Sequence, residues 1–446
     1  MHRSTRGRHL RPHYDAVYCI PRRTGRDLRP AVNRTREALR TSIETLQYEL
    51  VNFCAELVRT DSQNPPGDTG RLANLIKTRL SALPDIELRS IVAKEPAVNL
   101  VATVKGTKPG RRLVFNGHLD TFPIGDPAPW TTNPLGGEIE NGKIYGRGAC
   151  DMKAGIAASV MAFELLAGCR EDWNGEVVLA LVGDEETGGV WGTQYLLANI
   201  EEAVGDAMIN GDAGSPLVAR IGEKGNLWIK VCATGVPNHG AHVHLGKNAI
   251  ETLLSALEPV LALRNTPCPL PNDIAGTIEE ARTVSEPLSG MGESDTLRNI
   301  TVNLGHIKGG LNINTIPASA EAMLDIRLPP GVTIPDVKAS LADALDDLPN
   351  ISWEVLSECA PNWTEPNHEL VRLIHANAAE VTGGEVAVNL RPGFSDARFY
   401  RLRGVPSVVY GVASNNMGGA DEFASIDDLR AVFAVHTLTA FDYLSA

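Results

Sequence analysis

Six acidic or imidazole side chains lie in four short, glycine-containing segments of the sequence. They are His118 and Asp120 in GHLDTFP, Asp151 in YGRGACDMKAG, Glu185 and Glu186 in GDEETGG, and Asp212 in NGDAG. Imidazole nitrogens and carboxylate oxygens are ligands with which proteins bind Zn²⁺ and related divalent cations. The residue types therefore indicate chemistry at a bound cation, provided that the fold gathers the four segments.

Each segment also has a simpler interpretation when it is taken alone. His118 and Asp120 point the same way on an extended strand, so Asp120 could fix the tautomer of a metal-binding His118. Asp151 precedes an expected helix and could be only its N-cap. Glu185 and Glu186 could mark a surface turn, but the apolar run VVLALV before them must be buried, and adjacent carboxylates at the end of a buried strand need a cation or a proton.

Alternating strands and helices position these segments. Residues 97–106, 111–120 and 175–186 read as strands, the last two nearly continuous in apolar residues, and residues 43–60, 70–83, 153–168 and 190–203 read as helices. This order predicts an α/β domain with a mixed, mostly parallel sheet flanked by helices. The candidate residues would then share the carboxyl edge of the sheet, where ligands bind in open α/β folds.

After Gly225 the pattern changes to alternating, half-exposed strands. Strands are expected at 227–235, 298–310 and 319–328 and helices at 247–263 and 337–348, with a long proline-containing loop after residue 263. We expect an inserted α+β lid and dimerisation domain over residues 225–355. The catalytic domain then comprises residues 42–224 and 356–446, where a helix at 367–381, a strand at 406–412 and a helix at 426–443 complete it.

Charge and composition limit the partners. The net charge is −13, but residues 1–41 hold eleven arginines and only three acidic residues, a charge of +8, so the remainder carries −21. An acidic body argues against nucleic acid as a partner, and no apolar run approaches the length that spans a membrane. The seven cysteines include no CxxC pair, which indicates reduced thiols and a soluble, cytoplasmic protein. We expect residues 1–41 to be a disordered leader, or sequence upstream of the true start, outside the fold.

The four motifs, in this order, resemble those of family twenty of the metallopeptidases. That family includes acetylornithine deacetylase, succinyl-diaminopimelate desuccinylase, aminoacylase and carboxypeptidase G. Further matching segments are GVPNHGAHVHLGKNAI (235–250), GGLNINTIPASAEAMLDIR (309–327), GFSDARF (393–399) and ADEFASIDDL (420–429). GFSDARF looks closer to the desuccinylase and deacetylase branch than to broad peptidases. The resemblance therefore implies zinc-exopeptidase-like architecture and hydrolysis of a small N-acyl amino acid, with a dipeptidase or carboxypeptidase as the alternative.

The resemblance also implies a role for individual residues. His118 and Asp212 would bind a first cation, Asp151 would bridge two cations, Glu186 would bind the second, and Glu185 would be the general base. The cation would be Zn²⁺, with Co²⁺ or Mn²⁺ possible, at one or two per chain. In a homodimer, His239 of the partner subunit would stabilise the oxyanion, although an exposed loop histidine is the alternative. Arg327 would bind the substrate carboxylate, unless it forms a structural ion pair, and Asn314 and Ser395 would be further substrate contacts.

One position departs from the family pattern. The family has a histidine ligand for the second cation four residues before the glutamate of its last motif, and here that position is Gly418, ahead of Glu422. Asn415 or Asn416 could supply a weaker oxygen ligand, and His436 lies in an expected helix where packing is its ordinary role. Three hypotheses follow: an enzyme with a weak second site, an enzyme with one cation, and an inactive protein that only binds acylated amino acids or peptides.

Overall fold

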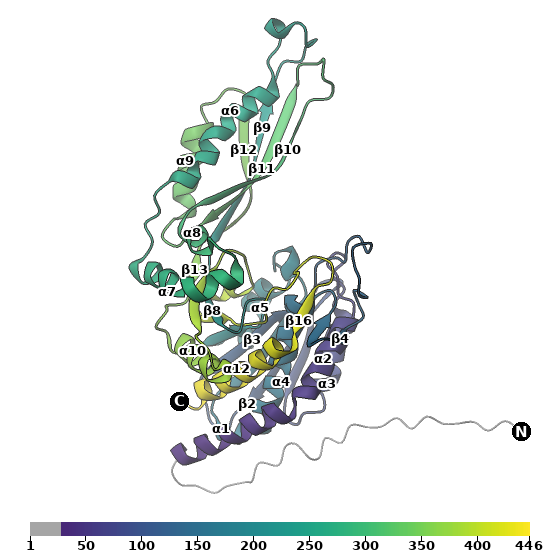
Figure 1. Cartoon of the computed structure of the whole chain (residues 1–446), viewed down its shortest axis with the longest axis vertical. Coiled ribbons are helices and arrows are strands. Elements are labelled where there is room, and N and C mark those ends of the chain that lie inside the picture. The colour runs from purple at the N-terminus through teal and green to yellow at the C-terminus, as the bar shows by residue number, and fades with distance from the viewer. Residues whose placement is uncertain (1–27) are drawn as a thin grey trace, which may run out of the picture.

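A computed structural model describes residues 28–446, which form two parts (Figure 1). The larger part contains the C-terminus and a wide sheet. The narrower part, called the lid domain below, extends away from it. Strand β8 (Val218–Glu223) of the larger domain continues through Lys224 into β9 (Gly225–Thr234) of the lid. The two domains are therefore joined by extended backbone.

Nine strands form the central sheet of the larger domain. Strands β6, β3, β7 and β15 run parallel in its middle, and antiparallel pairs lie toward the edges. The order across the sheet is β1 (Glu87–Lys94), β2 (Ala97–Lys105), β6 (Glu176–Val182), β3 (Arg112–His118), β7 (Ala207–Asn210), β15 (Ser407–Val409), β8 and β13 (Asn362–Trp363), and β14 (Ala387–Arg391) pairs with β8. The predicted mixed, mostly parallel sheet is confirmed.

Helices cover both faces of this sheet. Because successive strand residues point to opposite faces, Leu113 and Phe115 of β3 join one core and Val114 joins the other. The first core is covered by α2 (Gln47–Arg59), α3 (Gly70–Leu80), α4 (Ala154–Gly168), α10 (Glu369–Thr382) and α12 (Ile426–Leu444), and the second by α5 (Thr193–Asn199) and α11 (Ala397–Arg401). Single-turn helices η2 (Arg170–Asp172) and η4 (Glu201–Ala203) lie in connections. A strand buried on both faces explains why its sequence is apolar throughout.

A small three-stranded sheet brings the last motif beside the second one. Its strands are β4 (Glu138–Glu140), β5 (Lys143–Tyr145) and β16 (Phe423–Ser425), in the order β16-β5-β4. Phe423 pairs with Tyr145, and the Gly146 N–H donates to the Glu422 carbonyl. The turn that carries Asp151 is therefore held against the segment around Glu422.

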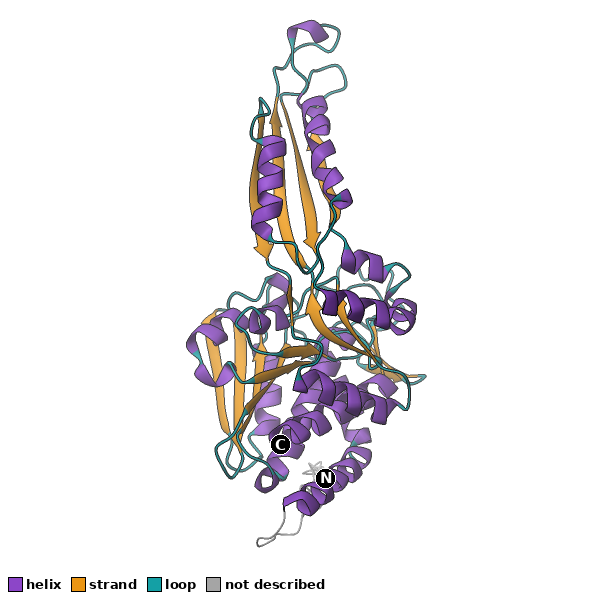
Figure 2. Ribbon diagram, turned by 90° about the vertical axis from the view of Figure 1, so that its left-hand side faces the viewer, coloured by secondary structure: helices purple, strands orange, loops and turns teal. Residues whose placement is uncertain are grey.

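The lid is an antiparallel sheet with two long helices on one face (Figure 2). Its strands, in spatial order, are β10 (Thr301–Gly309), β11 (Ser319–Leu328), β9 and β12 (Ile351–Cys359). Helices α6 (Ala249–Ala262) and α9 (Ile334–Leu345) bury apolar side chains against β9, β11 and β12, and η6 (Leu263–Asn265) extends α6. Strand β12 reaches Cys359, four residues past the expected boundary at 355.

The expected long loop after residue 263 differs from the structure. It contains helices α7 (Asn272–Ser289) and α8 (Glu293–Arg298). Ile274, Ile278 and Ala281 are buried at helical spacing, and α7 packs on β14 of the larger domain. Pro287 lies in the last turn, where it stops no long run of hydrogen bonds. Residues 272–298 thus pack with the larger domain although they lie within the predicted lid range.

The expected exclusion of residues 1–41 also differs in part from the structure. Helix α1 (Leu28–Thr45) includes residues 28–41, and Leu39 and Ile43 are buried in the main core. Arg36 binds Asp442 of α12, with Nε 3.0 Å from Oδ1. Residues 1–27 lie outside the described part of the chain. Among the described helices none is both long and apolar enough to cross a membrane, and the six described cysteines are free thiols.

Candidate metal centre

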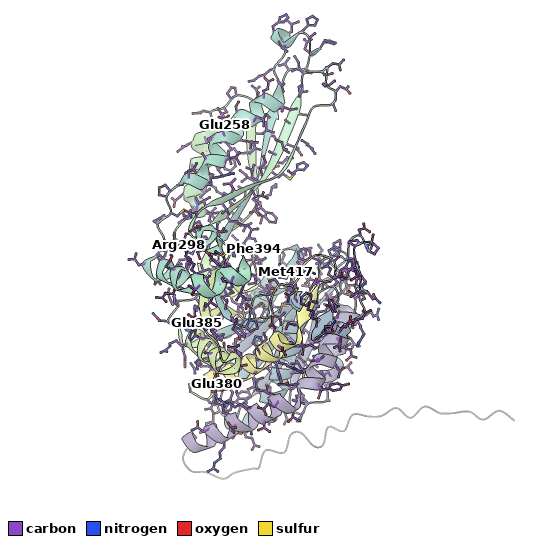
Figure 3. The ribbon with its side chains drawn as sticks, viewed as in Figure 1. Glu258, Arg298, Glu380, Glu385, Phe394 and Met417 are labelled. Atoms are coloured by element: carbon purple, nitrogen blue, oxygen red, sulfur yellow. The ribbon has the colours of Figure 1, made fainter. Side chains whose placement is uncertain are left out.

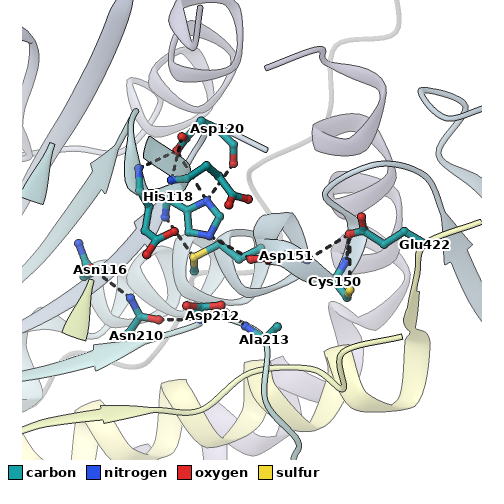
Figure 4. Close-up of polar contacts among 12 residues, drawn as sticks. Asn116, His118, Asp120, Cys150, Asp151, Asn210, Asp212, Ala213 and Glu422 are labelled. Carbon is teal, nitrogen blue, oxygen red and sulfur yellow. Dashed lines mark hydrogen bonds and ion pairs between the residues drawn. The ribbon is translucent and has the colours of Figure 1, made fainter. Parts of the chain in front are cut away.

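Three predicted ligands converge at the carboxyl edge of the central sheet (Figure 4). His118 ends β3, Asp151 lies in the short helical turn η1 (Ala149–Lys153) before α4, and Asp212 follows β7. One ligand atom from each lies within 4.8 Å of those from the other two. All three side chains are almost fully withdrawn from solvent. The parallel strands therefore bring together residues separated by up to 94 positions, as the sheet-edge argument predicts.

The His118 ring is fixed at both nitrogens. Nδ1 lies 2.8 Å from the backbone carbonyl of Asp120, and Nε2 lies 3.0 Å from Asp151 Oδ1. An N–H at Nδ1 that donates to the carbonyl leaves the Nε2 lone pair facing the other two ligands. Burial alone would lower the pKa of His118, but the hydrogen bond to Asp151 and its negative charge raise that pKa well above its ordinary value.

The Asp120 carboxylate has a different task from the expected one. It lies 3.7 Å from His118 Nδ1, whereas the Asp120 carbonyl is within hydrogen-bonding distance. The carboxylate instead accepts hydrogen bonds from the Asn64 side chain and from the backbone N–H groups of Glu185 and Glu186. Asp120 thus positions the turn that carries both glutamates, and it fixes the histidine only through its backbone.

The two glutamates lie in the single-turn helix η3 (Glu185–Thr187) directly after β6. Glu186 Oε1 is buried without a hydrogen-bond partner. Burial, with the negative charge of Asp151, raises the pKa of Glu186 to about 10. Glu185 Oε1 lies 3.2 Å from Nη1 of Arg398, so a guanidinium holds this carboxylate at the rim of the cluster.

The donor set fits a divalent cation. Burial raises the pKa of Asp212 to about 7 against the lowering effect of Arg391, so its anionic form is costly without a cation. A bound cation would offset that cost for Asp212 and would give the unpartnered oxygen of Glu186 a partner. His118, Asp151 and Asp212 are therefore the residues that would hold it.

The expected second metal site has Gly418 at the position where the family has a histidine ligand. Gly418 lies in an exposed turn with φ +72°, and a side chain there would extend toward Phe122, its nearest atom 3.7 Å from the added Cβ. Asn415 and Asn416 use their amide N–H groups to bind the carbonyls of Ala413 and Asp421 within this turn.

His436 lies in the core, far from any metal-binding role. Its side chain is fully buried, Nε2 lies 2.8 Å from the Tyr410 carbonyl, and the ring stacks on Phe115. Burial lowers the pKa of His436 to about 4, so the ring is neutral near neutral pH. The packing role expected for it agrees with these contacts.

A buried ion pair that the sequence analysis did not identify holds Asp151 in place. Arg147 Nη1 lies 2.6 Å from Glu422 Oε2, and both side chains are at most 2% exposed. Glu422 Oε1 accepts the backbone N–H groups of Cys150 and Asp151. Glu422 belongs to the quoted last motif, but its partner 275 positions earlier could not be inferred from spacing.

Two further arginines reach the cluster from the C-terminal segment. Arg391, the last residue of β14, places Nη1 3.3 Å from Asp212 Oδ2. Arg398 of α11 contacts Glu185 and stacks its guanidinium 5.0 Å from the ring centre of Phe394. Arg398 lies inside the quoted GFSDARF segment, and that motif is the only sequence feature that could have pointed to it. No sequence feature pointed to Arg391.

The predicted substrate residues are dispersed over the chain. Arg327 is the penultimate residue of β11, near the larger domain; its guanidinium pairs through two nitrogens with Asp325 and lies 4.1 Å from the ring centre of Phe394. Figure 3 places Phe394 where the lid meets the larger domain. Ser395 is fully buried and donates to Glu223, so its hydroxyl positions that carboxylate and is closed to substrate.

His239 and Asn314 lie together at the tip of the lid. His239 forms an isolated bridge with Thr315, and the Asn314 carbonyl accepts the Gly240 N–H. Both side chains are exposed, and the single-turn helix η5 (Val243–Leu245) lies beside them. The loops that carry them follow the ends of β9 and β10 remote from the larger domain (Figure 1), so one chain does not bring His239 to its own metal centre.

Comparisons with known proteins agree with this geometry. Residues 114–442 match the description "Peptidase family M20/M25/M40". Succinyl-diaminopimelate desuccinylase from Rhodospirillum centenum is 30% identical over 402 residues, which are 86% of this chain and 95% of that protein. A solved M20 metallo-carboxypeptidase from Sulfolobus solfataricus superimposes with a TM-score of 0.74 at 19% identity, covering 89% of this chain and 100% of that one.

A further solved structure concerns the number of metal ions. A Bacillus subtilis protein described as a dinuclear metal binding peptidase of the M20 family superimposes with a TM-score of 0.63 at 13% identity, covering 90% of this chain and 99% of that one. At these identities the two solved structures show the fold. Fold, centre and relatives together define a metallohydrolase that acts on amide bonds. The chain belongs to peptidase family M20/M25/M40.

Proposed function

We propose that this chain hydrolyses the amide bond of a small N-acyl amino acid with a free carboxylate. The observation that carries the proposal is the convergence of His118, Asp151 and Asp212 beside Glu185 on the adjoining turn. The similarity to a desuccinylase supports an acyl group on the substrate nitrogen. Peptide substrates are the second candidate, because a metallo-carboxypeptidase shares the fold.

Some residues of the centre would bind the cation, and Glu185 would transfer the proton. A bound Zn²⁺, or Co²⁺ or Mn²⁺ in its place, supplies a Lewis acid that acidifies water and polarises the substrate carbonyl. Glu185 is the carboxylate placed to take the proton from the attacking water and to pass it to the leaving amine. Arg398 orients Glu185, and Asp120 holds the backbone of the same turn.

Arginine side chains at the junction of the domains favour a substrate with a free carboxylate. Nη1 of Arg327 is buried without a hydrogen-bond partner, while its other nitrogens bind Asp325. Arg327 of the lid and Arg398 of the larger domain both lie against the ring of Phe394, so two guanidinium groups meet at the junction of the domains. A planar guanidinium with a free N–H binds a carboxylate well.

The lid tip is proposed to act in a homodimer. His239 is exposed, and neighbouring apolar side chains are exposed as well, Leu311 at 94% and Ile313 at 106%. Such a surface on an isolated chain fits a second copy. His239 of that copy would stabilise the oxyanion, a role that needs a donor aimed at the reacting carbonyl.

A hydrolysis screen tests the activity. Purified protein is assayed with N-acetyl and N-succinyl amino acids and with dipeptides, with Zn²⁺, Co²⁺ or Mn²⁺ added. Glu185→Gln should lower kcat by about 10²–10⁴-fold with metal content unchanged, and exposed Glu140→Gln should leave kcat unchanged. Binding of these compounds without turnover of any of them would refute the hydrolase and leave a binding protein.

Mixing two inactive variants tests the dimer. Glu185→Gln and His239→Ala are purified separately, mixed and allowed to exchange subunits. If His239 acts across the dimer, activity should recover to about one quarter of wild type, because half of the dimers are mixed and one of their two sites is intact. Absence of recovery, with exchange shown by mass spectrometry, would place His239 outside the partner's site.

A further inference from the structure

Too few donors surround the position where a second cation would bind. Among the described residues the group of three or more closely spaced donors is His118, Asp151 and Asp212. Glu186 adds one buried, unpartnered oxygen. The turn that would supply another ligand has glycine at 418, and Figure 3 places its neighbour Met417 on the upper rim of the larger domain. One ion can be held by this set, and a second would depend on Glu186 and a shared Asp151.

A guanidinium is fixed against the same cluster. Arg391 Nη1 lies 3.3 Å from Asp212 Oδ2 and donates to the Ala213 carbonyl at 3.2 Å. The Arg391 carbonyl accepts the backbone N–H of Lys224, which anchors the residue at the junction of the domains. The other Asp212 oxygen accepts the Ala213 N–H at 2.5 Å. Because a guanidinium stays protonated in proteins, Arg391 is a permanent positive charge at this edge.

Once the ion pairs are counted, the carboxylates of the centre keep two negative charges that one divalent cation would neutralise. Four carboxylates face the centre, and two of them already have a cationic partner, Asp212 with Arg391 and Glu185 with Arg398. Glu186 has no cationic partner, and Asp151 contacts only the His118 imidazole, which is neutral when it serves as a metal ligand. Their two negative charges equal the charge of one divalent ion. A second such ion would leave a surplus of positive charge in a site screened from water, which is costly.

We propose that this centre holds a single divalent cation and that the fixed positive charge of Arg391, beside the first-site ligand Asp212, disfavours a second cation. The inference rests on the proposed function, since it concerns the same centre. It distinguishes this chain from its structural relative described as dinuclear. Arg391 acts here as a positioning residue for Asp212, because it contacts a ligand and not the reacting atoms.

Metal titration of the whole protein tests the number of ions. Protein freed of metal by chelation is titrated with Co²⁺ and followed by calorimetry, by visible absorption and by elemental analysis after desalting. One equivalent should bind, and the electron paramagnetic resonance spectrum should be that of an isolated ion. Two equivalents with comparable affinity, or a spectrum of two coupled ions, would overturn the proposal.

Two double variants test the role of Arg391. Gly418→His restores an imidazole, and Arg391→Gln removes the charge, so Gly418→His/Arg391→Gln should bind a second Co²⁺ at least tenfold more tightly than Gly418→His. The matched control Gly418→His/Arg391→Lys keeps the charge and should bind one ion. Circular dichroism selects variants that fold, because residue 418 has positive φ. Equal second-site affinity in both double variants would refute the role of Arg391.

The outcomes separate this inference from the proposed function. One bound ion without any hydrolysis would refute the activity and support the single-ion centre. Hydrolysis with two bound ions would support the activity and overturn the single-ion centre. The titration uses the unaltered protein, so the number of ions is decided even if every variant fails to fold.

Discussion

Removal of the Arg147 side chain should strongly destabilise the larger domain. Arg147→Met leaves Glu422, whose side chain is 1% exposed, as a buried charge without its cation. Breaking a buried pair by removing one partner costs roughly 3–5 kcal/mol. The variant also loses the hydrogen bond from Arg147 to the Gly418 carbonyl, at 3.0 Å. We therefore expect the free energy of unfolding to fall by about 3–5 kcal/mol.

The assay is urea denaturation followed by tryptophan fluorescence, on protein kept metal-free with a chelator. Chelation matters because a bound cation adds its own binding energy to the stability. Trp130 is a suitable reporter, since the Arg147 guanidinium lies 5.2 Å from its ring centre. The control is Arg170→Met, which removes an exposed pair with Asp85 and should cost at most about 1 kcal/mol.

A double variant separates buried charge from lost packing. Arg147→Met/Glu422→Gln removes the uncompensated carboxylate and should recover at least half of the loss, since a buried pair replaced as a whole costs little. The affinity for a divalent cation should remain reduced, because a neutral amide oxygen accepts the Asp151 N–H more weakly than the Glu422 carboxylate does. A loss in Arg147→Met no larger than that in Arg170→Met would refute the reasoning.

Two further perturbations follow from burial and close packing. Burial lowers the pKa of His436 to about 4 from an ordinary 6.5, so its contribution to the free energy of unfolding is complete above pH 6.5 and is lost as pH falls through 4. In chemical denaturation, His436→Gln should remove up to about 3 kcal/mol of that pH dependence. Gly155→Ala would place a Cβ 1.9 Å from the Gly211 carbonyl oxygen; we expect a loss of roughly 1–3 kcal/mol and weaker metal binding in calorimetry, because Asp212 follows. Gly276→Ala, with open space around it, should cost nothing, and equal effects of the two alanines would contradict the packing argument.

The sequence predicted the ligands that stand at the ends of strands. A strand buried on both faces must be apolar throughout, so the change to His118 at the end of β3 and to Glu185 after β6 marks the edge of the sheet. Parallel neighbours then meet at that edge. This reasoning needs only local pattern and topology, and it singled out His118, Glu185, Glu186 and Asp212; the role of Asp151, in a turn before a helix, came from the family resemblance.

The arginines of the centre could not be predicted in the same way. Arg391 and its partner Asp212 lie 179 positions apart, and nothing local distinguishes Arg391 from an arginine at the end of any strand. Helix α7 was missed because its glycine, threonines and proline obscure an apolar stripe that packs on β14. Ser395 was assigned to substrate although its partner, Glu223, is defined only by the fold.

Burying the carboxylates of the centre costs free energy, and we expect metal binding to offset that cost. Close backbone contact between α4 and Gly211, and the pair of Arg147 with Glu422, fix Asp151 and Asp212 side by side before any cation is bound. Burial already raises the pKa of Asp212 to about 7, which measures the cost of its negative charge there. A cation binds only the folded arrangement, so its binding energy becomes folding energy. The thermal midpoint should therefore rise with added Co²⁺ in wild type, and the rise should be smaller in Asp212→Asn, which lacks one of the three ligands.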